Sequence, residues 1–373
     1  MSKRNQQRKV FRLTVTLALI VLLVACKTNP VSVPDIPALE NQPQEEIPSV
    51  DLLRMSPEIK DFSNAYGRSY RRAENRAWTL AHAAMDPYLL DFEYDPSITL
   101  PADQAFTARK GNCLTFSSLF IAMAREAGLD AWYQEVKIPP VWSNVNDTML
   151  VSKHVNAVVQ DRLRRYTVDV SGRQSQAVEQ VRRLSDSEAR AQYYNNLGAD
   201  ALMEEKLALA YAYFSKGLGN DPRLAYIWSN LGVVFRRNDQ TEEAILAYRT
   251  ALLLEPQQTV ALNNLYTIYD EDGDLDLAEE LKARVEKYRQ KNPYYLHYMA
   301  EMANEEQRWS DAIKLLNRAI QIDDNEYRFY FTLAQSQFHS GSTDAALENL
   351  EQARRLAPAS LKSSQLVLPD SNF

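Results

Sequence analysis

Gly111-Asn112-Cys113-Leu114-Thr115-Phe116 (GNCLTF) is the stretch that decides how the first half of this chain folds. It opens an apolar run at residues 114–127 that stops at Gly128, a residue typical of a helix C-terminus. Cys113 is therefore predicted at the N-terminus of a helix, where the helix dipole and unpaired amide groups stabilise a reactive thiolate. The alternative is that Cys113 is only a small buried hydrophobe, as lone cysteines in apolar helices usually are.

Two polar side chains further along the chain are suitable partners for this thiol. Residues 153–159 and 164–170 are β-rich and are joined by a polar turn, which predicts an antiparallel hairpin. If Asp161 and Arg162 form a two-residue turn, His154 lies directly opposite Asp169. That register is conditional, because Asp-Arg is not a favoured turn dipeptide. Cysteine, histidine and carboxylate together supply a nucleophile, a general base and a group that fixes the imidazole tautomer, as in thiol acyl-transfer enzymes.

The order of these residues resembles the core of the transglutaminase-like superfamily. The likeness covers roughly residues 100–172 and rests on the Gly-Asn-Cys turn, the helix after it and the strands that carry His154 and Asp169. It implies a papain-like α+β domain over residues 51–183, in which Cys113 is the nucleophile, His154 the base and Asp169 the orienting group. The backbone N–H of the cysteine is the oxyanion donor that we expect.

Helices and strands around this centre fit the same fold class. Four helices are predicted, followed by three strands, and helices packed on an antiparallel sheet make an α+β domain. The predicted ranges are 57–66, 69–85, 101–109 and 113–127 for the helices and 130–138, 153–160 and 164–170 for the strands. Trp132, Tyr133 and Trp142 are candidates for the wall of an acyl-binding cleft, although aromatic residues near strands are more often core.

The N-terminus has the layout of a secretory signal. Five basic residues precede a short apolar stretch, and residues 1–25 end at Leu23-Val24-Ala25-Cys26, which resembles the bacterial lipobox. By that resemblance Cys26 is lipidated and anchors the mature chain to a membrane, and Lys27 favours sorting to the outer membrane, facing the periplasm. Residues 26–50 are rich in proline and polar side chains, which predicts a disordered tether.

Composition limits the remaining classes of function. With 373 residues, 45% of them apolar, the chain is long enough for two domains. Its net charge is −7 and no basic patch interleaved with aromatic residues occurs, so nucleic acid is not an expected partner. No cofactor is predicted and no metal site either: the acidic run at residues 270–276 lacks the glycine that a calcium loop needs at its sixth position.

The second half of the chain repeats with a step of 34 residues. Residues 184–360 contain five copies of a helix-pair pattern, and residues 361–373 form a tail. The step and the signature positions resemble the tetratricopeptide repeat. The aligned positions are Leu197-Gly198, Leu231-Gly232, Leu265-Tyr266, Met299-Ala300 and Leu333-Ala334. Such repeats stack into a superhelix, and in this family its concave face binds peptides or partner proteins; an array that only spaces or dimerises the first domain is the alternative.

Two functional hypotheses follow from these patterns. The first is a membrane-anchored thiol enzyme in which Cys113, His154 and Asp169 cleave or transfer an acyl group, with water as the more available acceptor. The second is a catalytically silent adaptor that assembles protein complexes through its repeats. They differ in whether the function depends on the thiol of Cys113.

Overall fold

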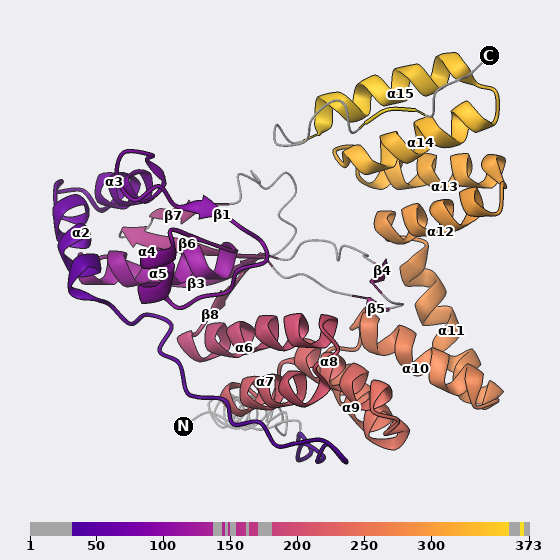
Figure 1. Cartoon of the computed structure of the whole chain (residues 1–373), viewed down its shortest axis with the longest axis horizontal. Helices are drawn as coiled ribbons and strands as arrows, with labels where there is room; N and C mark the ends of the chain where they lie inside the picture. The colour runs from indigo at the N-terminus through magenta and orange to yellow at the C-terminus, as the bar shows by residue number, and fades with distance from the viewer. Residues whose placement is uncertain are drawn as a thin grey trace, which may run out of the picture. The chain divides into compact units, whose positions relative to one another are not determined.

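A computed structural model describes residues 32–136, 144–145, 148–149, 154–161, 164–170, 181–357 and 366–368 (Figure 1). Residues from Ile36 onward form one compact unit. The predicted signal at residues 1–25, Cys26 and Trp142 lie outside the described residues. Within the described ranges, no helix has the length and apolar character needed to cross a membrane.

Four helices form the first part of this unit, close to the predicted ranges. They are α2 (Pro57–Gly67), α3 (Ala73–Met85), α4 (Ala102–Ala108) and α5 (Cys113–Glu126). α2 begins where expected because the Ser56 side chain accepts a hydrogen bond from the Ile59 N–H and Pro57 occupies the first helical position. α5 is almost wholly buried from Leu114 to Ala124, so it is the central helix of the domain.

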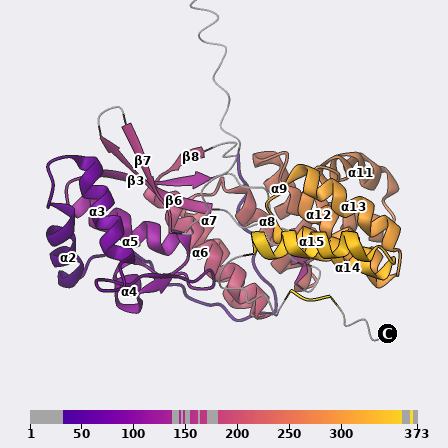
Figure 2. The ribbon, with the colours of Figure 1, turned by 90° about the horizontal axis from the view of Figure 1, so that it is seen from above.

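The helices pack on a four-stranded antiparallel sheet, which confirms the predicted α+β class. Its strands are β3 (Asp130–Val136), β6 (His154–Asp161), β7 (Arg164–Val168) and β8 (Val181–Leu184), in the order β7-β6-β3-β8. α3 and α5 contact β6, and α5 also contacts β3 (Figure 2). Two short pairs lie outside this sheet: β1 (Glu93–Tyr94) runs parallel to β2 (Lys110–Gly111), and β4 (Asn144–Val145) runs antiparallel to β5 (Thr148–Met149).

The predicted hairpin register is wrong by two residues. Asp161 pairs with Arg164, so Asp161 belongs to the strand ladder and not to the turn that the sequence predicts. Consequently Asp169 is not directly opposite His154 but diagonal to it. Because side chains alternate with a period of two, a slip of two residues keeps both on the same face.

The second part of the unit is the predicted helical array. Its ten helices form five consecutive pairs: α6 (Asp186–Met203) with α7 (Leu207–Asn220), α8 (Ala225–Arg237) with α9 (Thr241–Leu254), α10 (Thr259–Glu271) with α11 (Leu275–Arg289), α12 (Pro293–Glu305) with α13 (Trp309–Ile322), and α14 (Tyr327–His339) with α15 (Thr343–Leu356). From α8 onward the first helices begin 34 residues apart, as the repeat predicts. The acidic run at residues 270–276 is exposed and covers the end of α10, the turn after it and the start of α11.

Glycines in the first helices allow close contact with aromatic rings of the second. A Cβ atom on Gly198 would lie 2.6 Å from the ring of Phe214, and one on Gly232 would lie 2.5 Å from the ring of Tyr248. Both rings are fully buried. The small residue of the repeat signature is therefore needed so that the two helices of a pair can approach.

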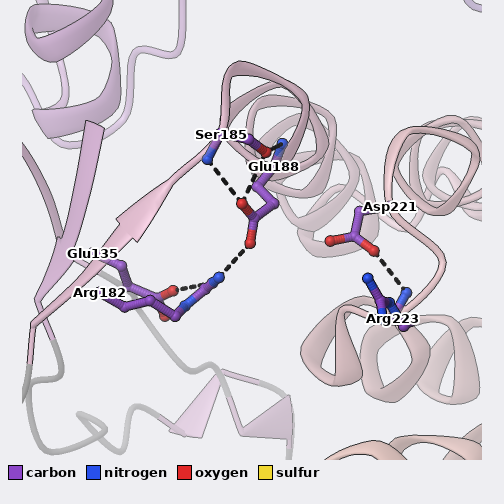
Figure 3. Close-up of polar contacts among 6 residues, drawn as sticks. All are labelled: Glu135, Arg182, Ser185, Glu188, Asp221 and Arg223. Atoms are coloured by element: carbon purple, nitrogen blue, oxygen red, sulfur yellow. Dashed lines mark hydrogen bonds and ion pairs between the residues drawn. The ribbon is translucent and has the colours of Figure 1, made fainter. Parts of the chain in front are cut away.

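The first repeat helix shares a core with the α+β domain. Ala189, Tyr193 and Tyr194 of α6 belong to the same buried cluster as Leu184 of β8 and the residues of α5. Only Ser185 separates β8 from α6, and it caps α6 in a capping box with Glu188. Arg182 of β8 forms ion pairs with Glu135 of β3, at 2.7 Å, and with Glu188 of α6, so it links the sheet to the first repeat helix (Figure 3).

Residues 37–50 differ from the disordered tether that composition predicts. They contain no helix or strand, but hydrogen bonds hold them on the first two repeats. The Tyr211 hydroxyl donates to the Pro37 carbonyl at 2.8 Å, and the Tyr194 hydroxyl donates to the Pro48 carbonyl at 3.0 Å. The segment cannot bury a core of its own, but its carbonyl groups can still accept hydrogen bonds from the surface of another element.

Candidate functional site

Cys113 is the first residue of α5, as the sequence predicts, and its side chain is partly exposed. The preceding residue, Asn112, is the N-cap: its Oδ1 accepts from the Thr115 N–H at 3.0 Å, and its Nδ2 donates to Thr99 Oγ1 at 2.7 Å. The amide of a first helical residue has no partner within the helix. The thiol therefore lies beside the positive end of the helix dipole, where negative charge is stabilised.

The turn before Cys113 is braced by residues that the sequence reasoning missed. Thr115 Oγ1 accepts from the Leu100 N–H at 2.9 Å and donates to the Ile98 carbonyl at 3.2 Å. A Cβ atom on Gly111 would lie 2.3 Å from the Thr115 side chain, so only glycine fits there. The sequence signal was the small residue in the GNC turn, but which threonine it packs against depends on the fold.

His154 and Asp169 come from β6 and from the residue after β7. The structure places His154 Nε2 2.5 Å from Asp169 Oδ2. Cys113 lies near enough to the imidazole to raise the pKa of His154, and since Nε2 contacts the carboxylate, Nδ1 is the nitrogen left for sulfur. The structure thus brings together the three residues that the sequence singled out.

Contacts on both sides of the imidazole favour its charged form. Burial by itself lowers the pKa of His154, but the hydrogen bonds to Asp169 and to Cys113 outweigh it and raise the pKa to about 9. The histidine is therefore mostly an imidazolium at neutral pH. An imidazolium beside a thiol at a helix N-terminus stabilises the thiolate, which is the nucleophilic form.

Tyr133 and Trp132 do not form the cleft wall that the sequence offered as one alternative. Tyr133 is fully buried in the core, where its hydroxyl donates to Ser118 Oγ at 2.9 Å. Trp132 is also buried, and the guanidinium of Arg183 lies 4.3 Å from its ring centroid. Both side chains serve packing.

Groups of acidic, histidine or cysteine side chains that could hold a metal ion are absent from the described ranges. The chemistry that this arrangement supports is nucleophilic attack by sulfur with proton transfer through an imidazole.

Comparisons with known proteins agree with this division of the chain. The sequence pattern of the transglutaminase-like superfamily matches residues 65–139, and that of the tetratricopeptide repeat matches residues 225–258. The chain contains a transglutaminase-like domain and a tetratricopeptide repeat. The first match includes Cys113 and ends before His154 and Asp169.

Curated relatives and solved structures are similar over limited parts. The uncharacterized protein ycf37 of Pyropia yezoensis is 38% identical over 85 residues, 23% of this chain and 48% of that protein. The photosystem I assembly protein Ycf3 of Cyanophora paradoxa is 32% identical over 102 residues, 25% of this chain and 59% of that protein. The chain spans about half the length of these relatives. A crystal structure of MamA is 16% identical, with a TM-score of 0.27, over 44% of this chain and 91% of that one.

Proposed function

We propose that this protein is a thiol acyl-transfer enzyme of the transglutaminase-like type that uses its repeats to bind a protein or peptide. The observation that carries the proposal is the contact of His154 with both Cys113 and Asp169. A cysteine that served only as a packing residue would need neither a buried imidazole beside its sulfur nor a carboxylate behind that imidazole.

The proposed reaction follows from the geometry. The Cys113 thiolate attacks an amide or other acyl carbonyl, and the backbone N–H groups at the start of α5 stabilise the oxyanion that forms. His154 donates its proton to the leaving amine, which leaves a thioester on sulfur. Water or a second amine, deprotonated by His154, then attacks the thioester carbonyl and releases Cys113. Asp169 keeps the imidazole in the required orientation throughout.

The pH dependence of Cys113 alkylation in the full chain tests the chemistry. A thiolate that persists well below the ~8.5 of an ordinary cysteine, and that weakens in His154→Ala, supports an ion pair. An ordinary pH profile in both proteins would contradict the enzyme hypothesis. Wild type and Cys113→Ala are then incubated with amide substrates in the presence of a second amine. A free acid as product identifies hydrolysis, which is the outcome we expect, and a new amide with the added amine identifies transfer.

Membrane anchoring is a second part of the proposal. The apolar stretch before Cys26 and the lipobox-like Leu23-Val24-Ala25-Cys26 support a lipoprotein that faces the periplasm from the outer membrane. Labelling with an alkyne fatty acid should modify the wild type and not Cys26→Ala. A wild-type chain that stays unlabelled and leaves the membrane fraction in salt would contradict anchoring.

An adaptor without catalysis is the second candidate. It is favoured by the similarity to Ycf3, whose name describes an assembly protein, and by the length of the repeat array. The Cys113→Ala variant decides between the two in a strain that lacks the protein. Full rescue would favour the adaptor, and loss of rescue at normal protein level would favour the enzyme.

A further inference from the structure

One helix of the α+β domain carries apolar side chains on more than its buried face. Ala77, Leu80 and Ala84 of α3 are buried in the core of the domain. Trp78 and Met85 lie on a neighbouring side of the helix, with 64% and 37% of their surfaces exposed. A surface helix of a globular domain normally has one apolar face and one polar face.

The exposed apolar side chains form a continuous stripe. Trp78, His82 and Met85 follow one another at spacings of four and three, which places them on one side of the helix. The Trp78 ring lies on the His82 ring, with centroids 3.9 Å apart. Tyr88 and Leu89, in the turn directly after α3, extend the stripe, and Tyr88 is 95% exposed. Scattered exposed apolar residues are ordinary, whereas a contiguous group marks an interaction site.

Positive charge gathers at the other end of the same helix. Arg68, Arg71, Arg72 and Arg76 lie within nine residues of a chain whose net charge is −7. From residue 62 to residue 89 the only carboxylates are Glu74 and Asp86. Glu74 accepts a hydrogen bond from the Tyr166 hydroxyl at 3.2 Å, and Asp86 accepts one from the Tyr88 N–H at 2.8 Å. Arg71 and Arg72 are exposed, and neither takes part in an ion pair within the described ranges. Their charge is therefore available to an anionic partner.

We propose that this surface, formed by Arg71, Arg72, Trp78, Met85, Tyr88 and Leu89 and called here the α3 surface, lies against an anionic phospholipid bilayer. Its composition matches the layers of a bilayer surface. Arginine attracts lipid phosphates, tryptophan and tyrosine prefer the boundary between headgroups and acyl chains, and methionine and leucine enter the apolar layer.

The inference is separate from lipidation of Cys26 and from catalysis. An anchor keeps the chain near a membrane in any orientation, whereas the α3 surface would fix which side of the domain faces the lipid. The test must therefore report on the position of Trp78 itself, not on whether the protein sediments with vesicles.

Quenching by brominated lipids provides such a report. The full chain is reconstituted into vesicles of phosphatidylcholine, with or without phosphatidylglycerol, whose acyl chains carry bromine. The emission of Trp78 is the difference between wild type and Trp78→Phe, and Trp228→Phe, which removes a buried tryptophan of α8, is the matched control. We expect the Trp78 contribution to be quenched in phosphatidylglycerol vesicles and the Trp228 contribution to be unaffected.

A charge variant tests why the surface binds. Each arginine near an anionic membrane contributes roughly 1 kcal/mol, so Arg71→Gln with Arg72→Gln should lower the equilibrium constant for lipid contact of Trp78 about thirtyfold. Unquenched Trp78 in both kinds of vesicle would overturn the proposal. Quenching to the same extent with and without phosphatidylglycerol would also overturn it. A third outcome against the proposal is protection of Trp78 from iodide that increases with protein concentration in the absence of lipid, because that would identify a second copy of the chain as the occupant.

Discussion

Replacing Asp169 by Asn should uncouple the thiol from its imidazolium. At pH 7.5 a group with the pKa of about 9 found for His154 is roughly 97% protonated, while an ordinary histidine is roughly 9% protonated. The variant keeps the size of the side chain but removes the charge that contacts Nε2. The protonated fraction of His154 should therefore fall by at most about tenfold, because Cys113 remains beside the ring. The fraction of thiolate that this imidazolium stabilises should fall in proportion.

The assay is the rate of iodoacetamide alkylation of Cys113 in the full chain between pH 5 and pH 10, read by mass spectrometry of the Cys113 peptide. Asp169→Asn should react up to ~10-fold more slowly than wild type at pH 7.5, because less of its His154 is in the imidazolium form. Asp161→Asn, at the far end of β6, is the matched control and should behave as wild type. Equal profiles for all three proteins would refute the argument that Asp169 sets the charge of His154.

Three further predictions concern stability. Because the pKa of His154 is raised, its stabilisation of the folded state is fully present below pH ~6.5 and is lost as the pH rises through about 9. The difference in urea midpoint between wild type and His154→Gln should therefore shrink over that range. A difference that stays constant with pH would contradict this prediction. Gly198→Ala should lower the free energy of unfolding in urea by ~1–3 kcal/mol, because the added Cβ atom would lie 2.6 Å from the Phe214 ring. Gly219→Ala, whose Cβ atom would have no neighbour within 4 Å, should not destabilise the protein. Asn112→Ala should lower the free energy of unfolding by about 1 kcal/mol and also slow the alkylation of Cys113. Ser56→Ala removes the cap of α2 and should lower stability without changing the alkylation rate. Equal alkylation rates in the two variants would show that the Asn112 cap does not position the thiol.

Local signals in the sequence were sufficient for α5 and for the repeat array. The apolar run after Asn112 and the stop at Gly128 define a helix whose bounds, Cys113–Glu126, match the prediction closely. The array is equally predictable because each helix pair depends mostly on its neighbours, so a constant step of 34 residues specifies the whole stack.

Features that depend on distant residues could not be predicted. Asp161 pairs with Arg164 instead of forming the turn, because the full ladder, not the turn dipeptide, decides the register. The sequence of β8 does not alternate between apolar and polar residues, so the pattern did not predict a strand there. β8 is stabilised instead by pairing with β3 and by the ion pairs of Arg182. Binding of residues 37–50 to Tyr194 and Tyr211 joins segments more than 140 residues apart.

The junction between the domain and the array affects how the two could work together. His154 pairs with Val136 at the end of β3, and the next residue back, Glu135, is held by the arginine that also holds Glu188 of α6. Exposed ion pairs contribute little alone, but here they lie beside an apolar core that continues from α5 into α6. α6 is therefore part of the domain that contains Cys113, His154 and Asp169 rather than an element joined to it by a linker. A protein bound on the first repeat would then be held at a fixed distance from Cys113, which is the arrangement that an enzyme needs if its own repeats present its substrate.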